Sequence, residues 1–406
     1  MIGTTIEWYD FTLYGPAAAL VFAPQFFPSV SPVAGTLASL STFAIGFLAR
    51  PVGGAIMGHL GDRIGRRKML LASLLIMGAA TAGVGLLPTY AAIGVAAPIL
   101  LVVLRLAQGL SVGGEWGGAV LMSMEHAPPE RRTLYGSFPQ LGLPAGVFLS
   151  TLVFLLVRLV LGEAAFAAWG WRIPFLLSFV LVVFGMVLRR RLEESPEFTR
   201  ARENQDVVRA PLSEVFRRLP RNLVAATGIS AQTSAFGIVV FTYSLTYVET
   251  RDLVSASAMM AITLTSSVVL TAGVPVGALL SQRFGRRRVI ICALTAQTLW
   301  AFPYFLLLDT GSVTAALLGS VVLGLVSGLS MGPLATFIAE AFPVSVRYSG
   351  ATVTYSVGGV LGGGLVSIVA TALVEATDNG LGIAAYLAVL GVISVSASAA
   401  LRSPVE

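Results

Sequence analysis

The sequence predicts an all-α membrane protein whose twelve transmembrane helices form two pseudo-symmetric six-helix bundles. Of the 406 residues, 56% are hydrophobic and only 11% are charged, and the mean hydropathy is +0.85, whereas a soluble domain carries roughly 25% charged residues. A transmembrane helix needs about 20 apolar residues, so the length accommodates about a dozen spans with short loops. Twelve separate apolar runs and a repeat between the two halves of the chain support the same prediction. The composition excludes a water-soluble globular domain and a disordered chain.

Charged residues and clusters of proline and glycine bound each apolar run. The runs place the helices at residues 3–27, 33–61, 69–88, 93–125, 133–161, 171–192, 220–248, 255–282, 288–308, 313–340, 347–374 and 380–401. A polar segment rich in arginine and glutamate separates the sixth helix from the seventh. We therefore expect an N-terminal bundle over 1–192, a cytoplasmic linker over 193–219 and a C-terminal bundle over 220–406.

The basic residues predict the orientation in the membrane. With a cytoplasmic N-terminus, most of the 26 lysine and arginine residues fall in cytoplasmic loops, while Arg158, Arg172 and Arg251 lie outside. Cytoplasmic loops are enriched in basic residues, so we expect a multi-pass protein of the inner (plasma) membrane with both termini in the cytoplasm. The net charge of +6 reflects this asymmetry, and no nucleic-acid partner is expected. Cys292 is the one cysteine, which excludes an intrachain disulfide or a cysteine zinc site, and we expect no metal site.

The two halves carry matching loops at a nearly constant offset. Residues 62–68 (DRIGRRK) follow the second helix, and residues 282–288 (QRFGRRR) follow the eighth. Matching residues also stand at the ends of the fourth and tenth helices. There Glu125 and Arg132 of the first half correspond to Glu340 and Arg347 of the second. Such a repeat indicates a duplicated bundle.

At residues 58–67 (GHLGDRIGRR) the chain resembles the major facilitator superfamily. Further stretches resemble its metabolite:proton symporter family, which includes shikimate, α-ketoglutarate, citrate and proline/betaine transporters. These stretches are 3–11 (GTTIEWYDF), 105–109 (RLAQG), 113–115 (GGE), 169–175 (WGWRIPF) and 193–198 (EESPEF). The resemblance covers essentially the whole chain and says little about the substrate. Family members usually carry a short basic segment before the first stretch. The osmosensing betaine carriers also have a long C-terminal coiled coil, whereas this sequence stops just after its last predicted helix. We therefore do not expect an osmosensor, and betaine stays open as a substrate.

The resemblance implies a conformational latch between the two bundles. In the family, the acid matching Asp62 bonds to neighbouring basic side chains and to the start of the eleventh helix, near 346–350. Since Gln282 replaces this acid in the second half, we expect the latch to be one-sided. The alternative is a solvated loop acid. The candidate latch residues are Asp62, Arg63, Gly65, Arg66, Arg67, Glu125, Arg132, Glu340 and Arg347.

Five charged residues inside the predicted spans are candidates for a function, and all five lie in the first half. They are Glu7, Asp10, Arg50, Arg105 and Glu115. A charge at mid-bilayer costs at least about 2.5–3.5 kcal/mol, so each needs a partner, a water-filled cavity or a function. The position matching Arg105 in the second half is Gly324, so the repeat is broken at a charged position.

The acidic residues of this set are candidates for proton coupling. Glu7 and Asp10 lie one helical turn apart, and Tyr14 continues that face. Two neighbouring carboxylates repel, which favours uptake of a proton by one of them. Alternatively, Glu7 is solvated at the helix end or pairs with the positive end of the helix dipole. Glu115 is the third candidate, with pairing to Arg50 as its competing role.

The two arginines are candidates for binding a carboxylate. Arg50 lies about 18 Å from the following loop, near the bilayer midplane, and Arg105 lies about as deep from the other side. A guanidinium offers a planar pair of donors that fits a carboxylate. The alternative is that both arginines pair with Glu7, Asp10 or Glu115 and lock the bundle. Uncharged groups that could contact substrate, or could serve helix packing, are Tyr14, Gln140, Gln232, Tyr243, Gln297 and Tyr355.

Together these features predict a secondary active transporter that takes up a small carboxylate-bearing or zwitterionic metabolite with protons by alternating access. We expect no cofactor, since the proton gradient is the driving force and the sequence has no phosphate-binding Gly-Lys-Ser/Thr motif. The partners expected are the substrate, protons and the lipid bilayer, and the protein is expected to be a monomer. The alternatives are an exporter or uniporter of the same fold and, from another class, a non-transporting membrane receptor. An enzyme is not expected, because no clustered nucleophile or metal ligands are present.

Overall fold

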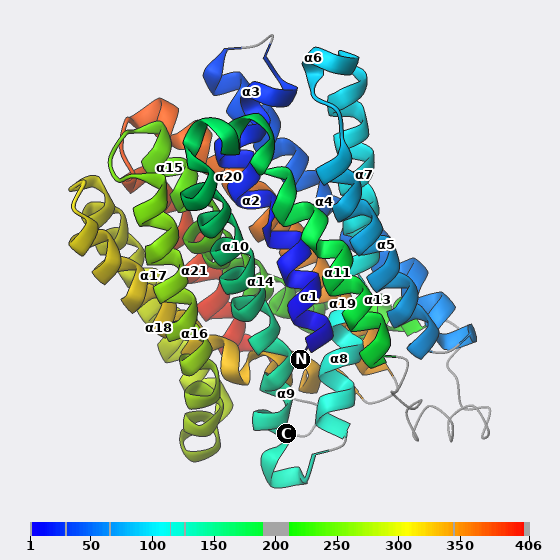
Figure 1. The fold of residues 1–406 in the computed structure, drawn as a ribbon. Coiled ribbons are helices and arrows are strands. Elements are labelled where there is room, and N and C mark those ends of the chain that lie inside the picture. Colours follow the sequence, from blue (N-terminus) through cyan, green and yellow to red (C-terminus); the bar gives the residue numbers. More distant parts are fainter. Residues whose placement is uncertain are drawn as a thin grey trace.

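The computed structural model describes residues 2–28, 31–64, 66–113, 115–125, 127–189, 211–343 and 346–401. These residues are mostly helical and include no strand, and the helices run roughly along one common direction (Figure 1). The described chain begins and ends at the same end of the bundle (Figure 1), which we call the terminal end, and we call the other the opposite end. The predicted all-α membrane fold is therefore confirmed.

The first half of the chain supplies six helical spans. Their elements are α1 (Ile2–Thr12), α2 (Tyr14–Ala17), η1 (Ala18–Phe22) and α3 (Ala23–Phe26) in the first span; α4 (Pro32–Ile64); α5 (Arg66–Leu86); α6 (Tyr90–Ile93), α7 (Ala96–Val112) and α8 (Glu115–Glu125); η2 (Pro129–Arg131), α9 (Arg132–Ser137), η3 (Phe138–Leu141), α10 (Gly142–Ala165) and η4 (Phe166–Gly170); and α11 (Arg172–Arg189).

The second half repeats this arrangement. Its elements are α14 (Pro220–Ile238), η5 (Val239–Tyr243) and α15 (Ser244–Thr250); α16 (Ala256–Phe284); α17 (Arg286–Asp309); α18 (Val313–Glu340); α19 (Arg347–Gly358), η7 (Gly359–Gly364) and α20 (Leu365–Thr377); and α21 (Leu381–Ala400). A short helix, α13 (Pro211–Arg218), precedes them inside the predicted linker. It places Val215 in the core and leaves Phe216 exposed.

Nine helices among the described residues are long and apolar enough to cross a membrane, and Leu71–Leu86 and Arg172–Val187 are shorter apolar helices. The first span differs from the continuous helix predicted at 3–27, because it divides into four short elements. Pro16 lies in α2, one turn after the end of α1, and has no backbone N–H to donate to the preceding turn. The π-helical segment η1 follows directly, and the matching seventh span carries the π-helical segment η5.

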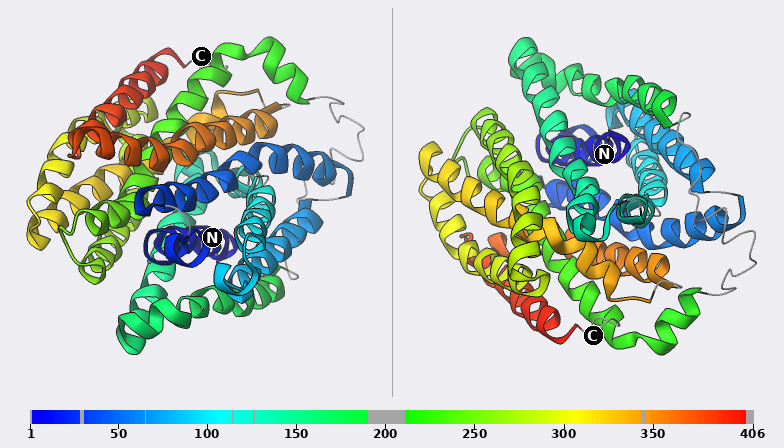
Figure 2. Two further views of the ribbon diagram at one scale, coloured as in Figure 1. Left: turned by 90° about the horizontal axis from the view of Figure 1, so that it is seen from above. Right: turned by 90° about the horizontal axis from the view of Figure 1, so that it is seen from below.

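The two six-helix halves face each other across the molecule, as the views from the two ends show (Figure 2). Each half contains helix pairs that pack through glycine against backbone. A Cβ added to Gly113 of α7–α8 would lie 2.0 Å from the carbonyl oxygen of Arg50 on α4, and one added to Gly277 of α16 would lie 2.3 Å from that of Leu329 on α18. Since neither position has room for a larger residue, these pairs hold each half together as a unit.

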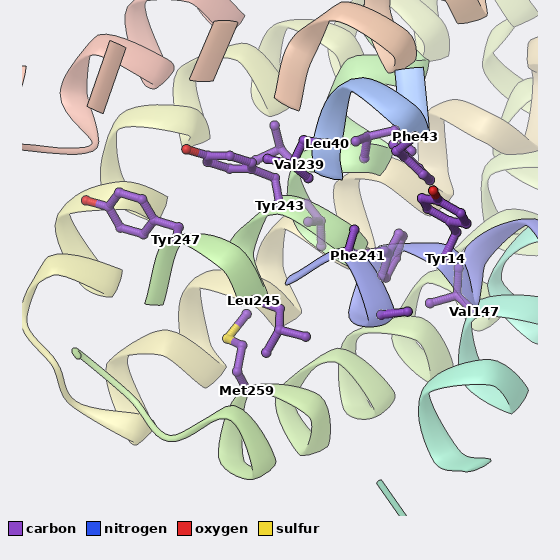
Figure 3. Close-up of a cluster of buried hydrophobic side chains, with 14 of the residues drawn as sticks. Tyr14, Leu40, Phe43, Val147, Val239, Phe241, Tyr243, Leu245, Tyr247 and Met259 are labelled. Carbon is purple, nitrogen blue, oxygen red and sulfur yellow. The ribbon is translucent and has the colours of Figure 1, made fainter. Parts of the chain in front are cut away.

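Contacts between the halves close the molecule toward the opposite end. Tyr14, Phe43 and Val147 of the first half and Val239, Phe241 and Leu245 of the second belong to one buried cluster (Figure 3). Near it, a Cβ on Gly15 would lie 2.6 Å from Cγ2 of Thr242. The first and seventh spans therefore touch here without an intervening gap.

Candidate functional site

A cavity of about 50 Å³ lies between the two halves, and we call it the central cavity. From the first half it is lined by Trp8, Thr12, Phe47, Arg50 and Gln140, among others. The second half contributes polar groups, which are Thr233, Ser234, Thr242, Gln297, Ser327 and Tyr355. Residues predicted as substrate contacts thus come together from both halves, in Arg50, Gln140, Gln297 and Tyr355.

Among the described residues that line this cavity, Arg50 is the only one with a charged side chain. It is 3% exposed, and its Nε and Nη2 have no hydrogen-bond partner. Its guanidinium carbon lies 4.1 Å from the ring centroid of Phe11 and 4.3 Å from that of Phe47. None of the ion pairs between described side chains involves Arg50. The aromatic rings stabilise the cation in part, while two of its donors stay available to a ligand.

Glu7 lines a second, smaller cavity of about 20 Å³, which we call the side cavity. Arg50 and Tyr355 line both cavities. Glu7 is 4% exposed, and its Oε1 has no hydrogen-bond partner. A carboxyl group and a guanidinium with free polar atoms therefore share one buried space.

Asp10 lies elsewhere, although it is only three residues from Glu7. It is fully buried, and Oγ of Ser178 on α11 donates to its Oδ1 at 2.5 Å. It lines neither the central nor the side cavity. Three residues turn a helix by about 300°, so two positions on one broad face can meet different neighbours. Asp10 consequently faces α11, and Glu7 faces the boundary between the halves.

Arg105 lies behind the central cavity and does not line it. Its Nη1 donates to Oε1 of Gln108 at 2.9 Å, and Nε2 of Gln108 donates to Oγ1 of Thr81 at 2.8 Å. The guanidinium carbon lies 4.1 Å from the Phe11 ring and 4.4 Å from the Tyr14 ring. Phe11 therefore contacts both buried arginines, and its side chain separates Arg105 from Arg50.

Three further predicted substrate residues lie outside the central cavity. Tyr14 shares a hydrogen bond of 2.5 Å with Thr42 of α4. Nε2 of Gln232 donates to Oγ1 of Thr298 at 3.1 Å, within the second half. Tyr243 is buried in the apolar cluster that Figure 3 shows. Their described contacts are hydrogen bonds within one half and packing in the buried cluster that joins the halves.

At the terminal end, the second half contacts the first through the end of α16 and the start of α17. Nε2 of Gln282 donates to the carbonyl oxygen of Glu130 at 3.2 Å. Arg286 donates from Nε to Oγ1 of Thr133 at 2.9 Å and from Nη1 to Glu340. Gln282 and Arg286 thus donate hydrogen bonds from the second half to the first. The one-sided latch expected at Asp62 stays a prediction, because Asp62 lies outside the described side chains.

The remaining latch candidates divide into two groups. Arg132, Glu340 and Arg347 line a large pocket of about 860 Å³ at this end, and Nε of Arg347 donates to the carbonyl oxygen of Phe342 at 3.1 Å. The others lie outside the described side chains, as does the coupling candidate Glu115: they are Asp62, Arg63, Gly65, Arg66, Arg67 and Glu125.

Trp116 is a site residue that the sequence analysis did not identify. Its indole stacks on the ring of Tyr355 from the other half, with centroids 4.0 Å apart and planes 2° from parallel. Its Nε1 donates to Oε1 of Gln140 at 2.7 Å. The one signal in the sequence is its position directly after Glu115, between two pairs of glycines.

Comparisons with known proteins agree with this architecture. The profile of the Major Facilitator Superfamily matches residues 1–367. The inner membrane metabolite transport protein YhjE of Escherichia coli (strain K12) is 42% identical, over 98% of this chain and 91% of that protein. The shikimate transporter of the same strain is 41% identical, over 92% and 86%, and its proline/betaine transporter is 34% identical, over 97% and 80%. The solved xylose transporter XylE from E. coli, in a partially occluded inward-open conformation, has a TM-score of 0.77 at 18% identity, covering 98% of this chain and 94% of that chain.

Proposed function

Because the chain belongs to the Major Facilitator Superfamily, we propose that it takes up a small carboxylate-bearing or zwitterionic metabolite together with protons, by alternating access. The relatives are named as transporters and not as enzymes, and this chain is likewise a multi-pass transporter of small molecules. The substrate class, the proton coupling and the direction are the proposal.

The proposed substrate class rests on a single observation, which concerns Arg50. Its guanidinium is buried between the two halves with Nε and Nη2 unpartnered. A carboxylate can accept from two guanidinium nitrogens at once and neutralise the charge while it is bound. No described Asp or Glu lines the central cavity, so an anionic group meets no repulsion from a described side chain there. Shikimate, proline and betaine, the compounds named for two of the relatives, all carry a carboxylate.

Glu7 is the residue that we propose for proton coupling, with Asp10 and Glu115 as the other candidates. It shares the side cavity with Arg50. While the substrate carboxylate occupies Arg50, a protonated Glu7 avoids placing a second anion beside it. Loss of this proton produces a carboxylate that competes for Arg50 and favours release of the substrate. Proton and substrate then leave on the same side.

Charge supports the proposed orientation. Arg286, Arg287 and Arg288 lie at the terminal end, where they line the large pocket, and basic loops favour the cytoplasmic side. The terminal end thus faces the cytoplasm in this proposal. The two halves touch on both sides of the central cavity, and transport requires them to tilt apart at one end at a time. We propose a monomer that uses the proton gradient and no cofactor.

Counterflow in proteoliposomes tests the substrate class. The panel is shikimate, α-ketoglutarate, citrate and glycine betaine. At least one should exchange with wild-type protein, and Arg50→Gln should weaken its half-saturation at least about tenfold, since hydrogen bonds to charged groups contribute about 1.5–3 kcal/mol each. Arg158→Gln is the matched control, because Arg158 pairs with Glu163 away from the cavity. Wild-type half-saturation in Arg50→Gln would refute carboxylate binding at this residue.

A further inference from the structure

Gln140 presents a hydrogen-bond donor, and not an acceptor, to the central cavity. The indole N–H of Trp116 can only donate, so its 2.7 Å bond to Gln140 requires the amide oxygen on the Trp116 side. The amide nitrogen, Nε2, is left without a partner although it is buried. Gln297 is different, because its 2.7 Å partner is the Ser327 hydroxyl, which can donate or accept and leaves the amide free to present either atom.

The unpartnered donors of Gln140 and Arg50 therefore line one cavity. Nε2 of Gln140 adds to the free Nε and Nη2 of Arg50. A carboxylate group is acceptor-only and has several lone pairs. It can satisfy donors from both residues, whereas an ammonium group or an amide N–H would face them unfavourably.

Trp116 also bridges the two halves. It lies on α8 of the first half and stacks flat on Tyr355 of α19 in the second. Both residues line the side cavity, and Tyr355 lines the central cavity as well. Stacking on Tyr355 holds the Trp116 ring in place. Separation of the two halves at the terminal end would break this stack.

We propose that Trp116 is a positioning residue, which holds Gln140 as a donor to the substrate carboxylate while the terminal end is closed and releases it when this end opens. This inference rests on the proposed carboxylate substrate. It makes affinity depend on conformation: the carboxylate has its full set of donors in the closed state and loses the fixed orientation of one donor as the halves separate. Loading and release are coupled through one indole N–H.

Trp116→Phe tests the inference, because phenylalanine keeps an aromatic ring for Tyr355 but has no N–H for Gln140. The probes are shikimate, α-ketoglutarate, citrate and glycine betaine, and the readouts are dissociation constant and maximal exchange rate in proteoliposomes. We expect the dissociation constant of each bound probe to rise about fivefold or more, since the free amide can turn its oxygen toward the carboxylate. Trp169→Phe is the matched control, since Trp169 is 51% exposed and away from the cavity, and it should bind like wild type.

Two variants of Gln140 separate positioning from a merely structural role. Gln140→Glu keeps an oxygen for the Trp116 N–H and replaces the cavity donor by a second oxygen, so it should bind the probes at least about tenfold more weakly. In a Gln140→Leu background, Trp116→Phe should add no further loss, because its effect acts through the amide. These variants also test the donor if Trp116→Phe does not reach the membrane.

The outcomes distinguish the inference from the function on which it rests. If wild-type protein binds none of the four carboxylates, the proposed function fails and the inference fails with it. If wild type binds a probe and both Trp116→Phe and Gln140→Glu bind it equally well, only the inference is overturned. The same holds if Trp116→Phe weakens binding equally with and without Gln140.

Discussion

Thr133→Val should shift the protein toward states that are open at the terminal end. Thr133 lies on α9 of the first half and accepts a hydrogen bond of 2.9 Å from Nε of Arg286 in the second half. Valine has nearly the same shape but no acceptor, so the change removes this bond between the halves and leaves local packing intact. Arg286 keeps its ion pair with Glu340, which lies within its own half.

The structure sets the size of the effect. Thr133 is 3% exposed, while the Arg286 side chain is 31% exposed and regains water when the bond is lost. A net value of about 1 kcal/mol follows for one such hydrogen bond. The ratio of open to closed states should then rise about fivefold. The neighbouring bond from Gln282 to Glu130 is unchanged in this variant.

Labelling of a cysteine in the central cavity measures this ratio. Cys292 is exposed, so it is first replaced by serine, and Ser234→Cys then places a single thiol in the cavity lining. A membrane-impermeant maleimide applied at the terminal end should label Thr133→Val about five times faster than the parent. The rate follows the open population when opening is rare and rapid.

Thr265→Val is the matched control, because the Thr265 hydroxyl donates to the Ala261 carbonyl oxygen within its own helix, at 3.0 Å, and not to the other half among the described residues. Its labelling should equal that of the parent. Equal labelling of Thr133→Val and Thr265→Val would show that the Arg286–Thr133 bond does not hold the terminal end closed.

Two further predictions concern the buried charges. Glu7→Gln should abolish accumulation driven by a pH gradient but preserve substrate-for-substrate exchange, which needs no net proton release; if Glu7→Gln and Asp10→Asn both still accumulate substrate, neither residue carries the proton. Gly46→Ala should lower the Tm of the purified protein, because the added Cβ would lie 2.5 Å from Nε of the buried Arg105 and overpacking costs about 1–3 kcal/mol. Gly237→Ala, where a Cβ would have nothing within 4 Å, is its control, and equal Tm values would show that Arg105 moves aside without cost.

The helices were predictable because each span is an apolar run of membrane-spanning length. The tenth span was expected at 313–340, and α18 covers Val313–Glu340. The break in the first span was not predicted, since a π-helical segment leaves the apolar pattern unchanged. Helix α13 was also missed, because its eight residues read as part of a polar linker. Both features depend on tertiary packing, since the first span contacts η5 and α15 of the other half and α13 packs against α14 and α19.

The candidate site was predictable in kind but not in arrangement. Arg50 and Arg105 look equivalent in the sequence, because each is one charge deep inside an apolar run. Depth can be counted along a helix at 1.5 Å per residue, but the facing neighbour depends on how the helices assemble. In the structure Arg50 lines the central cavity, while Arg105 donates to Gln108 behind Phe11.

The contacts of Trp116 could not be predicted from the sequence either. In the sequence it is an aromatic residue among glycines, which is typical of helix packing. Its contacts come from Gln140 on the next span and Tyr355 in the other half. Neither contact follows from spacing along one helix, so only the assembled fold reveals them.

Simultaneous recording of proton and carboxylate movement tests whether the protein couples the two and whether Arg50 is required for both. Proteoliposomes containing a pH-sensitive dye would receive each of the four carboxylates at the outside, without an imposed gradient. The proposed mechanism predicts that uptake of the transported carboxylate acidifies the interior in wild type and that Arg50→Gln lowers uptake and acidification together. Carboxylate uptake with no proton movement, or undiminished proton-coupled uptake in Arg50→Gln, would contradict it.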